Sequence, residues 1–298
     1  MATEVLDSER STVNTPNTQN VTPRDEKRKD RGKELWALLR NSVKLTTDLV
    51  KKSDVLPSTV SHGVHHLRKI NHDEEILDVL YNPVAEEIVT LDNQFVRVFH
   101  KDGRRKDIVD LGESINKIIF TNHSQQYVGL WNNEEIKLFS SDLELVSTAK
   151  GQHKIHCMMY NESTSEVITS GPGNLTTWCF RYGNRYMIPH KIITEGLTCR
   201  DVFEKMALEN TASRSQRCYA ACGTAVAVFN LHEASLLAYK KDLHVRNITS
   251  LLFFNPLKHI ITGSRDGSIK VWDEDFGIKL VFVGHHGPVT SLNLYPQV

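Results

Sequence analysis

The chain has 298 residues, and Lys plus Arg and Asp plus Glu each number 36, so its formal net charge is zero. This balance argues against a general nucleic-acid partner, which normally shows a basic excess. Residues 1–10 are polar and lack the apolar run of a signal peptide, and no stretch approaches the length of a membrane span. We therefore expect a soluble, cytoplasmic protein that does not insert into membranes.

The five cysteines are odd in number and lack a CxxC pair; they are Cys157, Cys179, Cys199, Cys218 and Cys222. This spacing predicts neither a zinc site nor a disulfide framework. We expect most of them to be small buried residues on strands.

Residues 1–33 are rich in Ser, Thr, Asn and charge and contain little that a core could bury, which predicts a disordered tail. Acidic side chains interrupt the basic ones within residues 24–33, which is typical of a solvated segment. A basic arm that binds nucleic acid, or a targeting signal, is the alternative for this stretch.

Residues 34–63 are predicted to form an amphipathic helix and a linker. Over residues 35–50 the apolar side chains fill one half of a helical wheel and the polar ones the other. Pro57 prevents the helix from continuing. We favour packing of the apolar half against the following domain, because such helices usually bury their stripe. Docking into a partner or a membrane surface is the alternative.

A repeated pattern begins at residue 64 and is marked by aromatic residues at the end of an alternating segment. These residues are Phe99, Phe139, Trp178, Phe229 and Trp272. Their interval of about 40 residues suits a unit of four short strands. The interval between Trp178 and Phe229 is longer, which predicts an insertion within residues 204–217, either a surface loop or a short helix.

The repeat that ends at Trp272 carries the fullest pattern. Asp266-Gly267 separates an apolar run from an alternating strand, as in a tight hairpin. Trp272-Asp273 closes this strand, and His244 precedes the first strand of the repeat. The combination resembles a WD repeat, the four-stranded blade of a β-propeller. The resemblance implies an all-β propeller domain over residues 64–298.

We count five blades plus one further strand at residues 289–294, with an outer strand at residues 64–70. The family usually has seven blades, and the strands that would link the two ends are missing. We therefore expect an incomplete ring, in a fragment or shortened isoform of a longer protein. The alternatives are a five-bladed ring that closes on itself and an arc that another chain completes.

In the family, the His, Ser or Thr, Asp and Trp of a repeat form a buried hydrogen-bond chain. Carried over, these are His244, Ser264, Asp266 and Trp272, and the resemblance makes them structural rather than a catalytic triad. The other repeats depart from this pattern. At the position of Asp266, the first four repeats have Asn93, Asn133, Pro172 and Gly223. At the position of His244, the first repeat has His72, which fits the pattern, whereas Leu111 and Gly151 in the next two repeats do not.

We expect no catalytic, cofactor or metal site. His62, His65 and His66 are spaced like metal ligands, but neighbours in an extended segment point to opposite faces. The Gly171–Asn174 stretch lacks the Lys and the following helix of a phosphate loop, so the sequence predicts a hairpin turn there.

The resemblance implies a noncatalytic scaffold that binds other proteins, with no nucleic-acid partner. One alternative is an adaptor that reads peptides or phosphopeptides at the propeller mouth; another is an enzyme with a propeller active site. Residues 33–70 also resemble the helical lead-in of large multi-propeller WD proteins of cilia, which implies a ciliary or axonemal location.

Overall fold

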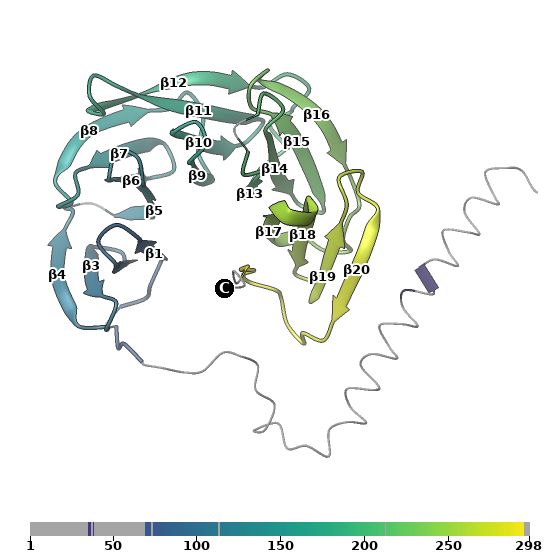
Figure 1. The fold of residues 1–298 in the computed structure, drawn as a ribbon, viewed down its shortest axis with the longest axis horizontal. Helices are drawn as coiled ribbons and strands as arrows, with labels where there is room; N and C mark the ends of the chain where they lie inside the picture. Colours follow the sequence, from purple (N-terminus) through teal and green to yellow (C-terminus); the bar gives the residue numbers. More distant parts are fainter. Residues whose placement is uncertain are drawn as a thin grey trace, which may run out of the picture. The chain divides into compact units, whose positions relative to one another are not determined.

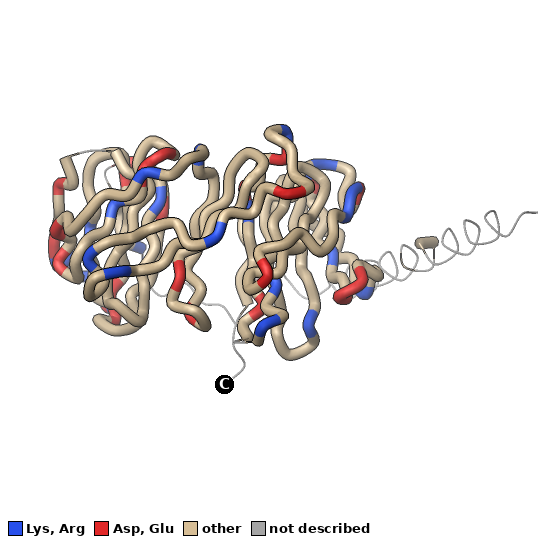
Figure 2. Tube along the Cα trace, turned by 90° about the horizontal axis from the view of Figure 1, so that it is seen from above, with Lys and Arg blue, Asp and Glu red and all other residues tan. Residues whose placement is uncertain are grey.

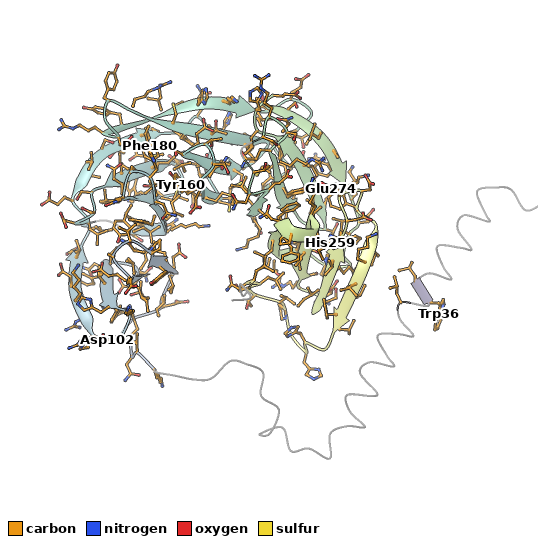
Figure 3. The ribbon with its side chains drawn as sticks, in the orientation of Figure 1. Trp36, Asp102, Tyr160, Phe180, His259 and Glu274 are labelled. Carbon is orange, nitrogen blue, oxygen red and sulfur yellow. The ribbon has the colours of Figure 1, made fainter. Side chains whose placement is uncertain are left out.

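The structure is a computed structural model that describes residues 35, 36, 38, 69–72, 74–112, 114–211 and 213–294. The chain divides into two units, Met1–Lys52 and Ser53–Val298. In the first unit Leu35, Trp36 and Leu38 are helical, and Figure 3 labels Trp36. The rest of the predicted helix 35–50, the tail 1–33 and the histidines at 62, 65 and 66 lie outside the described residues.

The described residues of the second unit form five antiparallel sheets of four strands, each a simple meander in chain order (Figure 1). The predicted all-β fold of five four-stranded blades is confirmed. The first blade consists of β1 (Asp78–Asn82), β2 (Glu87–Leu91), β3 (Phe95–His100) and β4 (Arg105–Asp110), and the second of β5 (Ile115–Thr121), β6 (Gln126–Trp131), β7 (Glu135–Phe139) and β8 (Leu145–Lys150). The third consists of β9 (Cys157–Asn161), β10 (Glu166–Gly171), β11 (Asn174–Arg181) and β12 (Tyr186–Ile193), and the fourth of β13 (Lys205–Leu208), β14 (Arg217–Cys222), β15 (Ala225–Asn230) and β16 (Ser235–Lys240). The fifth consists of β17 (Ile248–Phe254), β18 (His259–Ser264), β19 (Ser268–Trp272) and β20 (Ile278–Val283).

The aromatic residues of the repeat occupy equivalent places in all five blades. Each lies on the third strand of its blade, where the register with the fourth strand shifts by a β-bulge. A bulge bends and twists the strand locally. The outer strand therefore turns away from the sheet at the same level in every blade. The five residues are Phe99, Phe139, Trp178, Phe229 and Trp272.

Each junction between neighbouring blades holds one apolar cluster, so four clusters join the five blades. Between the fourth and fifth blades, the rings of Tyr219 and Phe253 stack with their centroids 5.1 Å apart. Because each cluster draws residues from two sheets, a single blade cannot bury its own face. Fully buried members of the four clusters are Val89, Ile118, Val128, Met158, Ile168, Phe229, Val226 and Ile260.

Asparagines at the ends of inner strands add polar links between blades. The Asn82 side chain donates to the Tyr127 hydroxyl at 2.8 Å, from the first blade to the second. Asn161 and Gln216 exchange two buried amide hydrogen bonds of 2.9 and 3.1 Å between the third and fourth blades. Buried amides with both partners in place resist separation of the sheets, because either one left alone would be unsatisfied.

The fourth blade differs from the sequence-based expectation of a loop or short helix within residues 204–217. Strand β13 (Lys205–Leu208) lies inside this range and is the innermost strand of the blade. Much of the extra length precedes it, in the loop 194–204. That loop is tied down where the Gly173 amide donates to the Asp201 carbonyl at 2.9 Å, and where Phe203 packs fully buried against Phe229.

The five sheets follow one another along an arc, with the first and fifth blades at its two ends (Figure 1). Exposed apolar side chains occur on both end blades, including Val79 and Tyr81 on β1 and Leu280 and Phe282 on β20. Val289 donates its amide to the Ser264 carbonyl, as inner strands of earlier blades do to the preceding blade. Residues 289–294 thus start where a sixth inner strand would start, although they pair with no described strand.

Candidate functional site

A buried chain of hydrogen bonds runs through the fifth blade. The indole N–H of Trp272 donates to Thr262 Oγ1 at 2.8 Å, and His244 Nε2 lies 2.7 Å from the same oxygen. The side chain of His244 is fully buried. It sits in the loop that leads into β17, Thr262 on β18 and Trp272 on β19, so the chain ties three successive segments of one blade together.

Asp266 and Ser268 complete the chain at its outer end. His244 Nδ1 lies 3.1 Å from Ser268 Oγ and 3.4 Å from the Asp266 carboxylate. Ser268 donates its amide and its hydroxyl to this carboxylate, at 2.8 and 2.5 Å. A carboxylate facing Nδ1 favours the tautomer with the proton there, so Nε2 accepts from the Thr262 hydroxyl. Each side chain thus donates a hydrogen bond to the next: Trp272 to Thr262, Thr262 to His244, and His244 to Ser268 and Asp266.

Ser264, which the resemblance places in this chain, lies nearby but does not take the indole proton. Its hydroxyl donates to the Arg246 carbonyl at 3.0 Å and accepts the Asp266 amide at 3.2 Å, so it fixes the hairpin turn. Thr262 takes the indole instead. Ile260 pairs with Trp272 across the two strands, and the residue two positions further along the strand faces the same side.

Burial and the charge of Lys270 keep the histidine neutral, although the Asp266 carboxylate acts in the opposite direction. Desolvation lowers the pKa of His244 from 6.5 to about 4, and the positive charge of Lys270 adds to this effect. Burial alone would raise the pKa of Asp266. The hydrogen bonds from Ser268 outweigh it and hold that pKa at about 2. A neutral imidazole beside an ionised, fully hydrogen-bonded carboxylate is a stable structural arrangement.

The first blade repeats part of this chain with different residues. His72 Nε2 lies 3.2 Å from Thr90 Oγ1, which matches the His244–Thr262 contact. The carboxylate comes from the buried Asp92, which pairs with Arg97. Asn93, at the Asp position by sequence spacing, is exposed. The last pair before the turn is Leu91 with Val96 in the first blade and Gly263 with Ile269 in the fifth, so the first blade has one residue fewer between its paired strands and its acid lies one position earlier.

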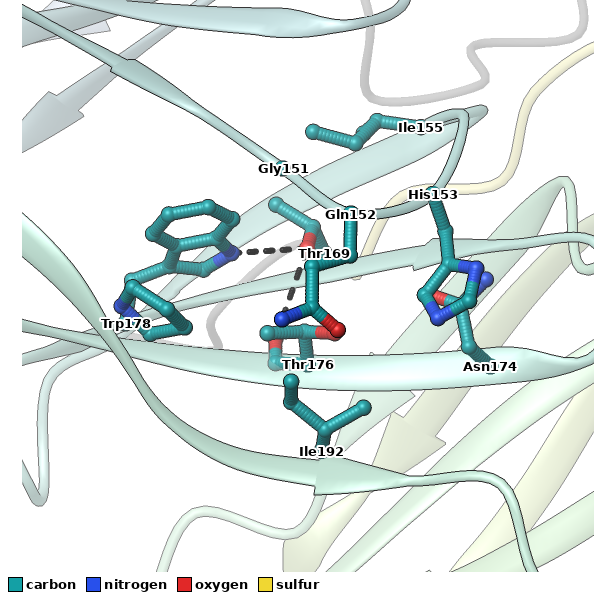
Figure 4. A pocket seen from close by; sticks show the side chains of 10 residues that line it. Gly151, Gln152, His153, Ile155, Thr169, Asn174, Thr176, Trp178 and Ile192 are labelled. Atoms are coloured by element: carbon teal, nitrogen blue, oxygen red, sulfur yellow. Dashed lines mark hydrogen bonds between the residues drawn. The ribbon is translucent and has the colours of Figure 1, made fainter.

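The third blade keeps the indole contact without a histidine partner. Trp178 donates to Thr169 Oγ1 at 2.8 Å (Figure 4). In the alignment of the repeats, Gly151 occupies the position of His244. Gly151, His153 and Ile155 line a small cavity of about 10 Å³ beside Thr169. This is space for about one water-sized sphere.

The second and fourth blades replace the strand-two threonine with Gly129 and Ala220, which lie at the equivalent register. A Cβ on Gly129 would come within 3.0 Å of Ile115 and 3.1 Å of Phe139, so apolar side chains fill the space. These two blades therefore rely on packing where the fifth blade uses polar contacts.

Within the described ranges, no group of three His, Cys, Asp or Glu side chains converges as metal ligands would. No described helix is both long and apolar enough to cross a membrane. Basic and acidic residues are interspersed over the strands and turns (Figure 2).

The substitution Thr262→Val tests the central hydroxyl of the buried chain. It keeps the shape of the side chain but leaves the Trp272 indole and the His244 ring nitrogen without a partner. We expect the free energy of unfolding to fall by about 1–3 kcal/mol, measured by urea denaturation. Thr164→Val, on an exposed turn, is the control and should change it little. An unchanged urea midpoint for Thr262→Val would show that this hydroxyl does not contribute to the stability of the fold.

The lowered pKa of His244 predicts a pH-dependent stability. As pH falls from 6.5 towards 4, the unfolded chain binds a proton at this residue that the folded chain does not. The free energy of unfolding therefore decreases with falling pH, by on the order of 2–3 kcal/mol for this group. Urea titrations between pH 7.5 and 4.5 should show a flatter dependence for His244→Gln, and the wild-type dependence for His259→Gln. Equal slopes for His244→Gln and wild type would contradict the burial of a neutral imidazole.

Comparison with known proteins agrees with this geometry. Residues 239–273, which run from the end of β16 to the residue after Trp272, match the family described as WD domain, G-beta repeat. The human protein WD repeat-containing protein 97 is 26% identical over 292 residues, which cover 94% of this chain and 18% of that protein. The chain thus spans less than a fifth of the length of this relative. The repeated blades and the polar chain of the fifth blade thus make this chain similar to WD-repeat proteins, and the family match covers β17 to β19 of its fifth blade.

Proposed function

We propose that this chain is a noncatalytic scaffold that binds other proteins. The observation that carries the proposal is how the fifth blade uses its polar groups. Both ring nitrogens of His244 have partners inside the blade, and the Asp266 carboxylate accepts from Ser268. Groups that could transfer protons are thus committed to holding strands together, and WD-repeat domains in general serve protein–protein interaction.

Exposed apolar side chains on the connecting turns support binding of proteins. Val245, before the fifth blade, is 86% exposed, and Leu257, on the turn between β17 and β18, is 64% exposed. Loops held by a rigid scaffold are where binding residues usually lie. The four apolar clusters between the blades supply that rigidity.

A peptide-reading adaptor is the second candidate, because a hollow runs along the inner strands of the first three blades. It has a volume of about 460 Å³ and is lined in part by Tyr81, Lys117 and Tyr160. The lining also includes the carboxylates of Asp78 and Glu162, so its aromatic rings and mixed charge suit a short peptide that carries both charged and apolar side chains.

The proposal has two finer parts. The first is that the arc works within a longer array of blades; its support is the exposed apolar residues Val79, Tyr81, Leu280 and Phe282 on the end blades. The second is a ciliary location, whose support is the resemblance of residues 33–70 to ciliary WD proteins. Fractionation of ciliated cells tests the location, since absence of the protein from isolated axonemes would contradict it.

Cross-linking in cells tests the scaffold. A tagged chain is treated with a lysine-reactive reagent, and the linked peptides are identified by mass spectrometry. We expect reproducible links to other proteins from the turn lysines Lys101, Lys154 and Lys258. A chain without such links that instead turns over small molecules in vitro would contradict the proposal. Binding of short peptides to the purified chain that is lost in Lys117→Ala would favour the adaptor.

A further inference from the structure

The hairpin of β11 and β12 in the third blade ends in an exposed, partly aromatic surface. Both strands have eight residues, whereas the strands of the other blades have four to seven. Tyr182 is 82% exposed, Tyr186 54% and Ile188 42%. Large side chains exposed together often mark an interaction site.

The turn of this hairpin has a fixed geometry. Tyr182, Gly183 and Asn184 all have left-handed backbone angles, with φ of 53°, 65° and 61°. The Gln126 side chain of the second blade donates to the Asn184 carbonyl at 3.0 Å, which ties the turn to the neighbouring sheet. The rings of Tyr182 and Tyr186 meet edge to face with centroids 6.0 Å apart. A surface that is already ordered loses little entropy on binding.

The strand register sorts the hairpin into an inner and an outer face. Phe180 pairs with Met187, and both pack on the core between the second and third blades. Arg181 pairs with Tyr186, so these two side chains share the opposite face. The exposed residues are therefore on the side of the hairpin that this core does not use.

The charge of the hairpin is one-sided. The sequence contains no Asp or Glu between Glu166 and Glu195, whereas Arg181 and Arg185 are both exposed. Across the described part of the chain, neither arginine forms an ion pair within 4.0 Å. Glu166, on the adjacent strand, is occupied by His190 Nδ1 at 2.6 Å and by the Thr164 hydroxyl at 3.0 Å.

We propose that Arg181, Tyr182, Arg185, Tyr186 and Ile188, here called the Tyr/Arg knob, bind an acidic segment of a partner protein. Tyr and Arg, with Trp, are enriched in the energetic centres of protein interfaces. The two arginines select carboxylates, and the two rings with Ile188 supply the apolar contact. Two cations are few for a nucleic-acid site, which usually shows an extended basic stripe. The inference rests on the proposed scaffold function and assigns it a surface.

The test measures binding of a fluorescein-labelled peptide of alternating Glu and Phe to the full chain by fluorescence anisotropy. The double substitutions Arg181→Gln/Arg185→Gln and Tyr182→Ser/Tyr186→Ser should each weaken binding by about tenfold or more, as loss of central interface residues does. Rising salt should weaken the wild type more than the arginine variant, because charge attraction is screened. Circular dichroism confirms that each variant remains folded.

The matched control is Arg104→Gln/Arg105→Gln, which removes the same charge from the equivalent turn of the first blade. It should bind the peptide as the wild type does. Equal weakening by the control, or full binding by both knob variants, would overturn the proposal. Tighter binding of single-stranded oligothymidylate than of the peptide would replace it with a nucleic-acid site. If the peptide does not bind while cellular cross-links persist, the knob is refuted and the scaffold is not.

Discussion

Burial of one sheet face against the next is the constraint on which this structure depends. Each blade has only four strands, and its apolar side chains find partners mainly in the adjacent blade. The four clusters at the blade junctions are therefore the real core of the protein, and the aromatic bulge residues hold the outer strands at a common level. A substitution at a junction should weaken two blades at once, because both share the cluster.

Polar contacts act within this apolar framework and vary from blade to blade. The fifth blade has the full chain from Trp272 to Asp266, the third keeps only the contact of Trp178 with Thr169, and the second fills the place of the threonine with Ile115 and Phe139. This variation is tolerated because packing supplies most of the stability. In the fifth blade, the complete hydrogen-bond chain also holds the loop before β17 in one position, because His244 lies in that loop.

The number of blades and the places of the five aromatic residues could be predicted from the sequence, because the repeat spacing and strand alternation are local signals. The partner of Trp272 could not, because Ser264 and Thr262 are both hydroxyl residues and only the strand register decides between them. Strand β13 was missed since its four residues carry no alternation. Sequence spacing places Asn93 at the acid position of the first blade, whereas the structure places the buried carboxylate of Asp92 there, because the strand register that shifts the position by one residue cannot be read from spacing. The knob residues were not singled out, because exposure on a hairpin depends on which face meets the core.

Hydrogen exchange measured by mass spectrometry tests the central claim most directly. If consecutive blades form one packed array, the amides of the two middle strands in all five blades should exchange slowly and open together when urea is added. Strong protection confined to the fifth blade, with rapid exchange in β2, β3, β6 and β7, would contradict the account. Such a result would mean that the polar chain, and not the packing between sheets, holds the protein together.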